Sequence, residues 1–125
     1  MYNMITAKGQ ANSEGQKMEL LLTEQISKEL QKQYQMGSDF EQMVICKLFD
    51  PCSSFTFYLL NQDPDDTSYL WSIVKNGEIV EMGSVSLTEL QAYKGPLNIG
   101  IERDLSFKPI KTKELWERLM RGENV

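Results

Sequence analysis

The chain has 125 residues and a formal net charge of −5, which leaves room for one domain with a single core. Because 41% of the residues are apolar and 25% are charged, with no apolar run long enough to span a bilayer, the composition is that of a globular protein. The acidic balance makes general affinity for nucleic-acid backbone unfavourable, and the lack of a signal-peptide pattern predicts a cytoplasmic protein with no membrane partner.

The N-terminal segment differs in composition from the rest of the chain. Residues 1–17 are polar and lack hydrophobic periodicity, which predicts a disordered extension. We expect a single domain over residues 18–121 and a short polar tail over residues 122–125, with neither an internal repeat nor a second domain.

A first helix is expected directly after the start of this domain. Thr23 is suited to cap a helix, and three apolar residues recur behind it at intervals of four: Ile26, Leu30 and Tyr34. The pattern predicts a helix over about 24–35 that ends before Gly37 and lies across a sheet.

The middle of the chain reads as an antiparallel sheet. Four runs rich in β-branched and aromatic residues follow one another, over 43–49, 55–60, 69–75 and 79–85. Asn76-Gly77 predicts a type I′ turn, so the third run should fold straight back as the fourth. Residues 61–68 are expected to form an acidic loop. Apolar residues alternate onto both faces of the middle runs, and so both faces should be covered.

The last third of the chain supplies further helices. Ser86-Leu87-Thr88-Glu89 has the spacing of a capping box, which predicts a helix over about 87–94 that ends at Gly95-Pro96, with the glycine in a left-handed conformation. An extended segment near 105–108 and a last helix capped by Thr112 should follow. The sequence therefore predicts a single α+β domain, an antiparallel meander sheet of about four to five strands with about three helices packed against it.

Several kinds of catalytic site are missing from the sequence. The chain contains no histidine, which excludes Ser-His-Asp and Cys-His nucleophile systems and histidine-based zinc sites. We predict no catalytic residue, no metal site and no cofactor. Cys46 and Cys52 lie close enough for a disulfide bridge to be conceivable, but two reduced thiols are favoured in a chain without a secretory signal.

Two charged clusters are candidates for binding a ligand or a partner. Glu102, Arg103 and Asp104 could bind a charged ligand or serve acid–base or metal chemistry; the favoured alternative is a structural network in which the arginine satisfies loop carbonyls. The second cluster is Asp63, Asp65 and Asp66. The favoured interpretation is a solvated loop. The alternative is a surface that faces a protein partner or mimics nucleic acid.

Aromatic residues on the predicted strands form a third candidate group. Aromatic side chains on a sheet can stack nucleic-acid bases, as they do in single-strand binders. Core packing is favoured here, because no lysine or arginine is interleaved with these aromatics: Phe55, Phe57, Tyr58, Tyr69 and Trp71.

Several short motifs of the chain occur together in a recognisable order. The most specific is the segment GPL…IERDL…F, which runs from Gly95 to Phe107. The others are Leu21-Leu22-Thr23, Lys47-Leu48-Phe49, Pro51, Phe55-Thr56-Phe57-Tyr58 and Gly83 ahead of Ser86-Leu87-Thr88-Glu89-Leu90. Over about residues 20–109, this set resembles a bacterial family of uncharacterised domains found on plasmids, conjugative elements and phages. Phe55 and Phe57 stand where the family often has tryptophans, and Leu70-Trp71-Ser72 replaces a more usual Phe-Gly pair. The resemblance implies a small α+β domain of a mobile element and carries no established activity.

Four functions follow as hypotheses. The leading one is a non-enzymatic binding or accessory protein of a mobile element that acts through protein contacts, with an unidentified protein partner and an undetermined oligomeric state. A specific form of it is an inhibitor of a host defence nuclease that presents the acidic loop. The alternatives are a metal-assisted phosphoester hydrolase using Glu102 and Asp104, with Glu81 as the nearest further carboxylate, and a single-strand nucleic-acid binder.

Overall fold

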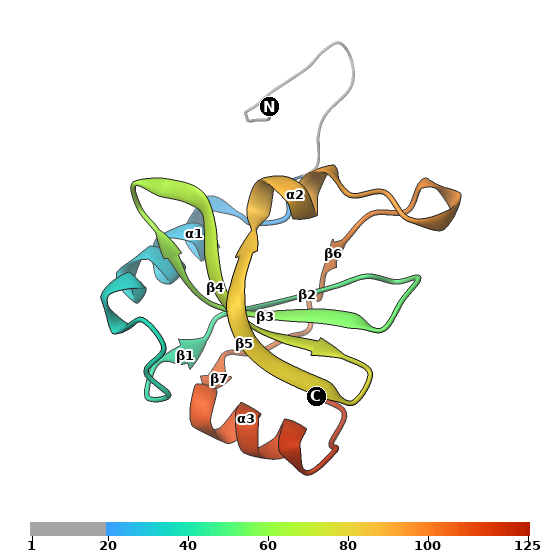
Figure 1. Ribbon diagram of the computed structural model, residues 1–125. Helices are drawn as coiled ribbons and strands as arrows, with labels where there is room; N and C mark the ends of the chain where they lie inside the picture. Colours follow the sequence, from blue (N-terminus) through green and yellow to red (C-terminus); the bar gives the residue numbers. More distant parts are fainter. Residues whose placement is uncertain (1–19) are drawn as a thin grey trace.

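The computed structural model describes residues 20–125 and shows an α+β domain built on an antiparallel sheet of five strands, as the sequence predicts (Figure 1). The described helices are α1 (Glu24–Lys32), α2 (Leu87–Ala92) and α3 (Thr112–Met120), with 3-10 turns η2 (Tyr34–Met36) and η3 (Pro96–Asn98). The strands are β1 (Met43–Val44), β2 (Cys46–Phe49), β3 (Phe55–Asp63), β4 (Asp66–Asn76), β5 (Ile79–Ser86), β6 (Glu102–Arg103) and β7 (Ile110–Lys111). The extension predicted over residues 1–17 lies outside the described residues.

The strands of the main sheet lie in the order β5-β4-β3-β2-β6, so β5 and β6 are its two edges. Strands β1 and β7 pair separately as a short antiparallel ladder. The predicted run over residues 43–49 is therefore interrupted at Ile45, where the chain passes from this ladder into β2. Within residues 20–125, no helix combines the length and the apolar composition needed to cross a bilayer.

Both faces of the sheet are covered, as the alternation of apolar residues predicts. Leu59 and Leu70 point to one face, where they pack with Leu30 of α1 and with α2. Leu60 and Ile73 point to the other face, where they pack with side chains of α3. Figure 1 shows α1 and α2 on one side of the strands and α3 on the opposite side. The period-two pattern of the middle strands thus assigns each residue to its face correctly.

The start and the end of α1 confirm the predicted signals. The hydroxyl of Thr23 accepts a hydrogen bond from the backbone N–H of Ile26 at 3.1 Å, which satisfies one of the free donors at the start of the helix. The helix ends at Lys32, and η2 follows before the chain turns at Gly37 with φ of 56°. A positive φ is accessible to glycine without steric cost.

The hairpin between β4 and β5 is confirmed, but its turn lies one residue later than predicted. Asn76 pairs with Ile79, which leaves Gly77 and Glu78 as the two-residue connection. Of these residues only Gly77 has a positive φ, 64°, which excludes a type I′ turn and fits a turn with glycine at its first central position. The observed register pairs Leu70 with Val85, whereas the predicted turn would have set Leu70 against a glycine.

The acidic loop predicted over residues 61–68 is wrong, because β3 and β4 continue almost to the tip of their hairpin. Asn61 is 1% exposed, and its amide nitrogen donates to the carbonyl of Gly37 and to the side-chain oxygen of Gln42, each at 2.9 Å. Gln62 is equally buried and donates to the carbonyl of Thr67 at 2.7 Å. These polar side chains extend the strand because their amides find partners inside the protein.

The segment after α2 differs from its prediction in three ways. The helix ends at Ala92, and Gly95 has a negative φ of −90° and leaves room for the Tyr93 hydroxyl; positive φ occurs instead at Leu97 and Asn98. In the extended segment expected near residues 105–108, residues 105 and 106 form a turn instead, in which the carboxylate of Asp104 accepts from the backbone N–H of Ser106 at 2.9 Å.

Thr112 does not cap the last helix as predicted. The N-cap of α3 is Lys111, and Thr112 is its first helical residue. The Thr112 hydroxyl donates to the carbonyl of Gln42 at 2.8 Å, and its backbone N–H bonds to the same oxygen at 3.0 Å. The Thr112 side chain, which the sequence predicted as the cap of α3, therefore makes a hydrogen bond to a distant part of the chain instead.

Candidate functional site

The predicted cluster at residues 102–104 lies at one edge of the sheet and is tied to the surrounding backbone. Glu102 and Arg103 form β6, in which Arg103 pairs with Leu48 of β2. The Arg103 guanidinium donates to the carbonyl of Leu21, ahead of α1. Asp104 lies 3.6 Å from the amino group of Lys47. The arginine thus satisfies a loop carbonyl, as a structural network requires.

The carboxylates named for metal chemistry do not gather around one point. Glu81 lies on β5, at the edge opposite β6, and four strand spacings of about 4.8 Å separate the two edges by about 19 Å. In the described part of the chain, no three acidic or cysteine side chains are placed to hold a metal ion together. The hydrolase hypothesis therefore rests on Glu102 and Asp104 alone.

The three aspartates of the second cluster do come together, at the tip of the β3–β4 hairpin. The carboxylate of Asp63 accepts from the backbone N–H of Asp65 at 2.8 Å, and that of Asp66 accepts from Ser68 at 3.2 Å. The Tyr34 hydroxyl donates to Asp63 at 3.1 Å, and this hydrogen bond raises the pKa of the tyrosine. The tip is therefore an ordered, negatively charged corner of the protein.

The aromatic candidates divide between core and surface. Phe57 and Tyr58 are 8% and 1% exposed, in agreement with core packing. Phe55 is 40% exposed and stacks on Phe57, with 5.9 Å between the ring centroids. Tyr69 meets Tyr34 edge to face at 6.3 Å. Of these accessible rings, Tyr69 lies on β4 beside β5, whereas Phe55 lies on β3, two strands from it.

Sequence reasoning missed the most distinctive surface of the molecule, which is the free edge of β5. Its partner β4 covers one side of β5, and no other strand in residues 20–125 pairs with it. In a two-residue hairpin, the residues that flank the turn are hydrogen-bonded to each other, and the bonded pairs then alternate along the ladder. The backbone groups of Val80, Met82 and Ser84 therefore point away from the sheet, where no strand of the described residues meets them.

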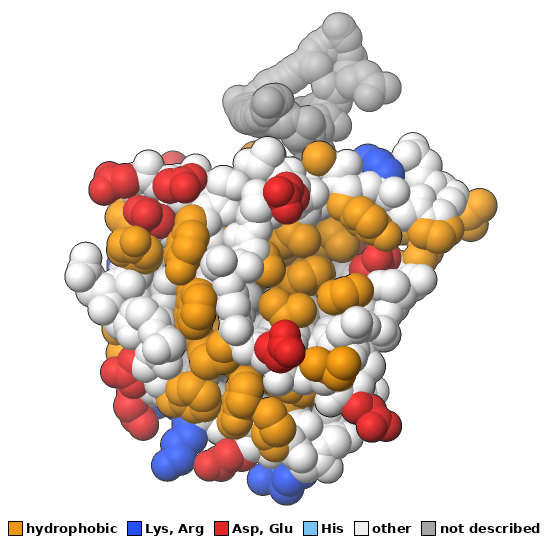
Figure 2. Space-filling view, in the orientation of Figure 1, with side chains coloured by type: hydrophobic (Ala, Val, Ile, Leu, Met, Phe, Trp, Pro, Cys, Tyr) orange, Lys and Arg blue, Asp and Glu red, His pale blue; other side chains and the backbone are white. Residues whose placement is uncertain are grey.

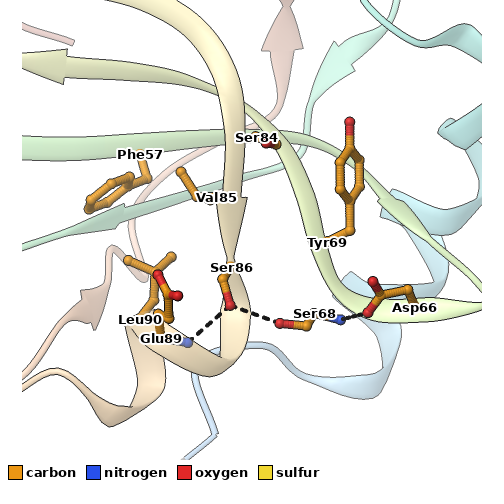
Figure 3. A pocket seen from close by; sticks show the side chains of 9 residues that line it. All are labelled: Phe57, Asp66, Ser68, Tyr69, Ser84, Val85, Ser86, Glu89 and Leu90. Carbon is orange, nitrogen blue, oxygen red and sulfur yellow. Dashed lines mark hydrogen bonds between the residues drawn. The ribbon is translucent and has the colours of Figure 1, made fainter.

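Apolar side chains flank this edge on both faces of the sheet. Phe57, Val85 and Leu90 lie on one side of the β5 ribbon and Tyr69 on the other (Figure 3). Figure 2 shows apolar side chains gathered on the face that β5 crosses, with isolated acidic groups among them. At the turn end of the strand, Ile79 is 60% exposed.

The two ends of the edge are fixed by different contacts. At its C-terminal end, the Ser86 hydroxyl accepts from the backbone N–H of Glu89 at 3.2 Å and lies 2.9 Å from the Ser68 hydroxyl (Figure 3). The first of these contacts is the N-cap predicted for α2. Because Ser68 also bonds to Asp66, the acidic tip is connected directly to the end of β5.

A glycine, Gly83, lies in the middle of β5. A Cβ atom added to Gly83 would meet no atom within 4 Å, so the space above this residue is open. Gly83 pairs with Ser72 of β4, whose hydroxyl is buried and meets no hydrogen-bond partner in the described residues. Glycine inside a strand is often found where another group approaches the backbone closely.

The part of the chain around β5 is strongly acidic. Residues 55–93 contain six acidic side chains and one basic side chain: Asp63, Asp65, Asp66, Glu78, Glu81 and Glu89 against Lys75. Within β5 itself Glu81 is the one charged residue, and it is not part of any ion pair among the described residues. The edge therefore combines unpaired backbone groups, apolar flanks and negative charge.

Comparison with known proteins gives a family but no activity. A family model described as "Protein of unknown function (DUF2958)" matches residues 20–123. No curated protein and no solved structure matches the chain.

Proposed function

Since the chain belongs to the family of proteins of unknown function DUF2958, we propose a role from its own surface: it is a non-enzymatic accessory protein that binds a protein partner by strand addition at β5. The observation that carries this proposal is the free edge of β5. Every second residue of this eight-residue strand directs its backbone N–H and C=O groups away from β4, and no described strand bonds to these groups. Extended segments bind such edges through main-chain hydrogen bonds.

The features that usually protect an exposed edge are scarce on β5. Proteins commonly shorten edge strands, interrupt them with proline or bulges, or place lysine on them to prevent unwanted pairing. β5 is eight residues long, contains neither proline nor lysine, pairs with β4 without a register shift, and has Glu81 as its single charged residue. This favours an edge that is kept available for a partner.

The setting of this role is a mobile genetic element. The similarity of the segment from Gly95 to Phe107 to domains of plasmids, conjugative elements and phages supports that setting. A small accessory protein in such a setting acts on proteins of the element or of the host, and strand addition needs no catalytic group.

Proline at an outward-facing position tests the proposal. Ser84→Pro removes one outward N–H and retains every hydrogen bond between β4 and β5, whereas Ser84→Ala keeps the backbone donor and serves as the matched control. We expect a tagged protein to capture a specific partner from host lysate, and Ser84→Pro to lose it while Ser84→Ala retains it. Equal capture by wild type and Ser84→Pro, at unchanged melting temperature, would contradict strand addition at β5.

A narrower form of this function is inhibition of a host defence nuclease. The acidic tip at Asp63, Asp65 and Asp66 adjoins the end of β5, so a partner on that edge would meet it. A basic nucleic-acid groove is the complementary surface for such a tip. Replacing the three aspartates by asparagine keeps their hydrogen-bond acceptors and removes three charges.

The triple asparagine variant separates the two forms of the proposal. We expect it to fold normally and to lose inhibition of a captured nuclease in a DNA-cleavage assay. Full inhibition by the variant would remove the nuclease form and leave strand addition at β5 to be judged by the proline variant.

A further inference from the structure

We infer that the β5 edge selects an extended segment with a basic side chain opposite Glu81 and an apolar side chain opposite Gly83, two residues away. This inference rests on the proposed function and adds the chemistry of the partner. It follows from the register of β5, from the open space at Gly83 and from the distribution of charge.

The register fixes which side chains of a bound segment meet which groups. In paired strands, directly opposed residues point to the same face, and residues two apart along a strand share that face. Glu81 and Gly83 are two apart, and their partners on β4 are Val74 and Ser72. A bound strand therefore places two of its side chains, also two apart, against this pair.

Gly83 leaves room for an apolar side chain on the strand added beside it. The space above Gly83 is open, and Phe57, Val85 and Leu90 border the same side of β5 (Figure 3). A leucine opposite Gly83 can lean over the glycine and cover these side chains. Its burial removes apolar surface from water, which is the main favourable term in association.

Glu81 sets the charge at the neighbouring position. The strand pairing aligns Glu81 with Val74 of β4 and, through it, with Phe57 of β3, so its carboxylate stands beside apolar residues. The basic residue in this row, Arg103, lies at the opposite edge of the sheet, beyond Leu48 of β2. Lysine or arginine opposite Glu81 gives a favourable cross-strand pair, and a carboxylate there gives an unfavourable one.

The same charges disfavour a second copy of this chain as the occupant. An antiparallel pair of β5 edges would bring together two surfaces that each contain six acidic side chains and one basic side chain over residues 55–93. Like charges in apposition oppose association, whereas a basic segment is attracted to this surface. The occupant is therefore a basic segment of a different protein.

Synthetic peptides test this preference with the protein as it is. The probe is Thr-Lys-Thr-Leu-Thr-Lys-Thr, acetylated and amidated, in which either strand direction places one lysine opposite Glu81 when leucine lies opposite Gly83. The matched control peptide has glutamate in place of both lysines. Titration at about 150 mM salt, followed by the backbone amide signals of Val80, Met82 and Ser84, reports binding at the edge.

We expect the lysine peptide to bind at least about fivefold more tightly than the glutamate peptide, which corresponds to one favourable cross-strand pair. Glu81→Lys should reverse this order, while Glu78→Lys, with the same change of charge in the turn outside β5, should leave the order unchanged. Gly83→Val fills the open space and should weaken the lysine peptide, whereas Ser84→Ala should not.

Two outcomes would overturn the inference. The first is equal affinity of both peptides for wild type and for Glu81→Lys; strand addition itself would survive if Ser84→Pro still abolished capture of the partner. The second is sedimentation of the wild-type protein as a dimer that Ser84→Pro dissociates, because the occupant would then be a second copy.

Discussion

The two edges of the sheet, β6 and β5, differ in how their backbone groups are bonded. At one edge, β6 is two residues long, the Arg103 guanidinium binds the Leu21 carbonyl, and the backbone N–H of Asp104 donates to the Lys47 carbonyl at 2.9 Å. At the other edge, every second residue of the eight-residue strand β5 has outward backbone groups that no described strand meets. The contrast shows that hydrogen bonds and an ion pair fix one edge, while no described strand covers the outer side of the other.

We expect the largest loss of stability from a substitution in the core next to β6, and a smaller loss from a substitution on β5. Leu48 is fully buried and pairs with Phe57 on one side and with Arg103 on the other. Leu48→Ala should lower the free energy of unfolding by about 2–5 kcal/mol in urea titrations, because a large side chain leaves a cavity. Val85→Ala, at a half-buried position of β5, should cost clearly less, and equal losses would contradict the contrast.

Removal of the arginine tests how the closed edge is held. Arg103→Ala leaves the Leu21 carbonyl without its charged donor and should lower the free energy of unfolding by about 1.5–3 kcal/mol. The neighbouring exposed residue is the control: Glu102→Ala should remain within about 0.5 kcal/mol of wild type. An unchanged free energy of unfolding for Arg103→Ala would mean that β6 is held by its backbone hydrogen bonds alone.

Proline substitution compares the two sides of β5 itself. Glu81→Pro removes an N–H that faces β4 and should lower the free energy of unfolding by about 1–3 kcal/mol, because the β4 carbonyl loses its partner. Ser84→Pro removes an N–H that faces away from the sheet and should cost less. Similar losses for both variants would show that the outward groups of β5 are already bonded.

The smallest expected effect is a difference in reactivity between the two cysteine thiols. Cys46 is buried on β2, next to the closed edge, and burial raises its pKa to about 12, whereas Cys52 is exposed in the β2–β3 connection. At pH 8 the Cys46 thiol is thus protonated and shielded, because its thiolate forms only as the pH approaches 12. One thiol per native molecule should react with a disulfide reagent, and both after unfolding; rapid reaction of Cys46 in the native protein would show that β2 is accessible.

The alternation of apolar residues predicted the faces of the sheet because each face is determined by residues two apart in the same strand. The parts of β3 after Leu60 and of β4 before Tyr69 were not predicted, because Asn61 and Gln62 are typical of loops. In the structure their side-chain amides donate to the carbonyls of Gly37 and Thr67. Such partners are distant in sequence or depend on the register of the hairpin, and no local pattern specifies them.

The candidate site was predicted less well for a related reason. The charged residues were visible in the sequence, and their local contacts, such as the Asp63–Asp65 turn, follow from it. Whether β5 is an edge depends on β6, which pairs with β2 rather than with β5 after an intervening helix. That choice is made by tertiary packing, and a pattern of eight alternating residues reads the same in an edge strand and in a central one.

Hydrogen exchange of the backbone amides along β5, followed residue by residue by NMR in the full chain, tests the open edge most directly. We predict an alternating pattern, in which the amides of Glu81, Gly83 and Val85 are protected by bonds to β4, while those of Val80, Met82 and Ser84 exchange rapidly. Uniform protection from residue 79 to residue 86 would contradict the account, because another segment would then already cover the edge.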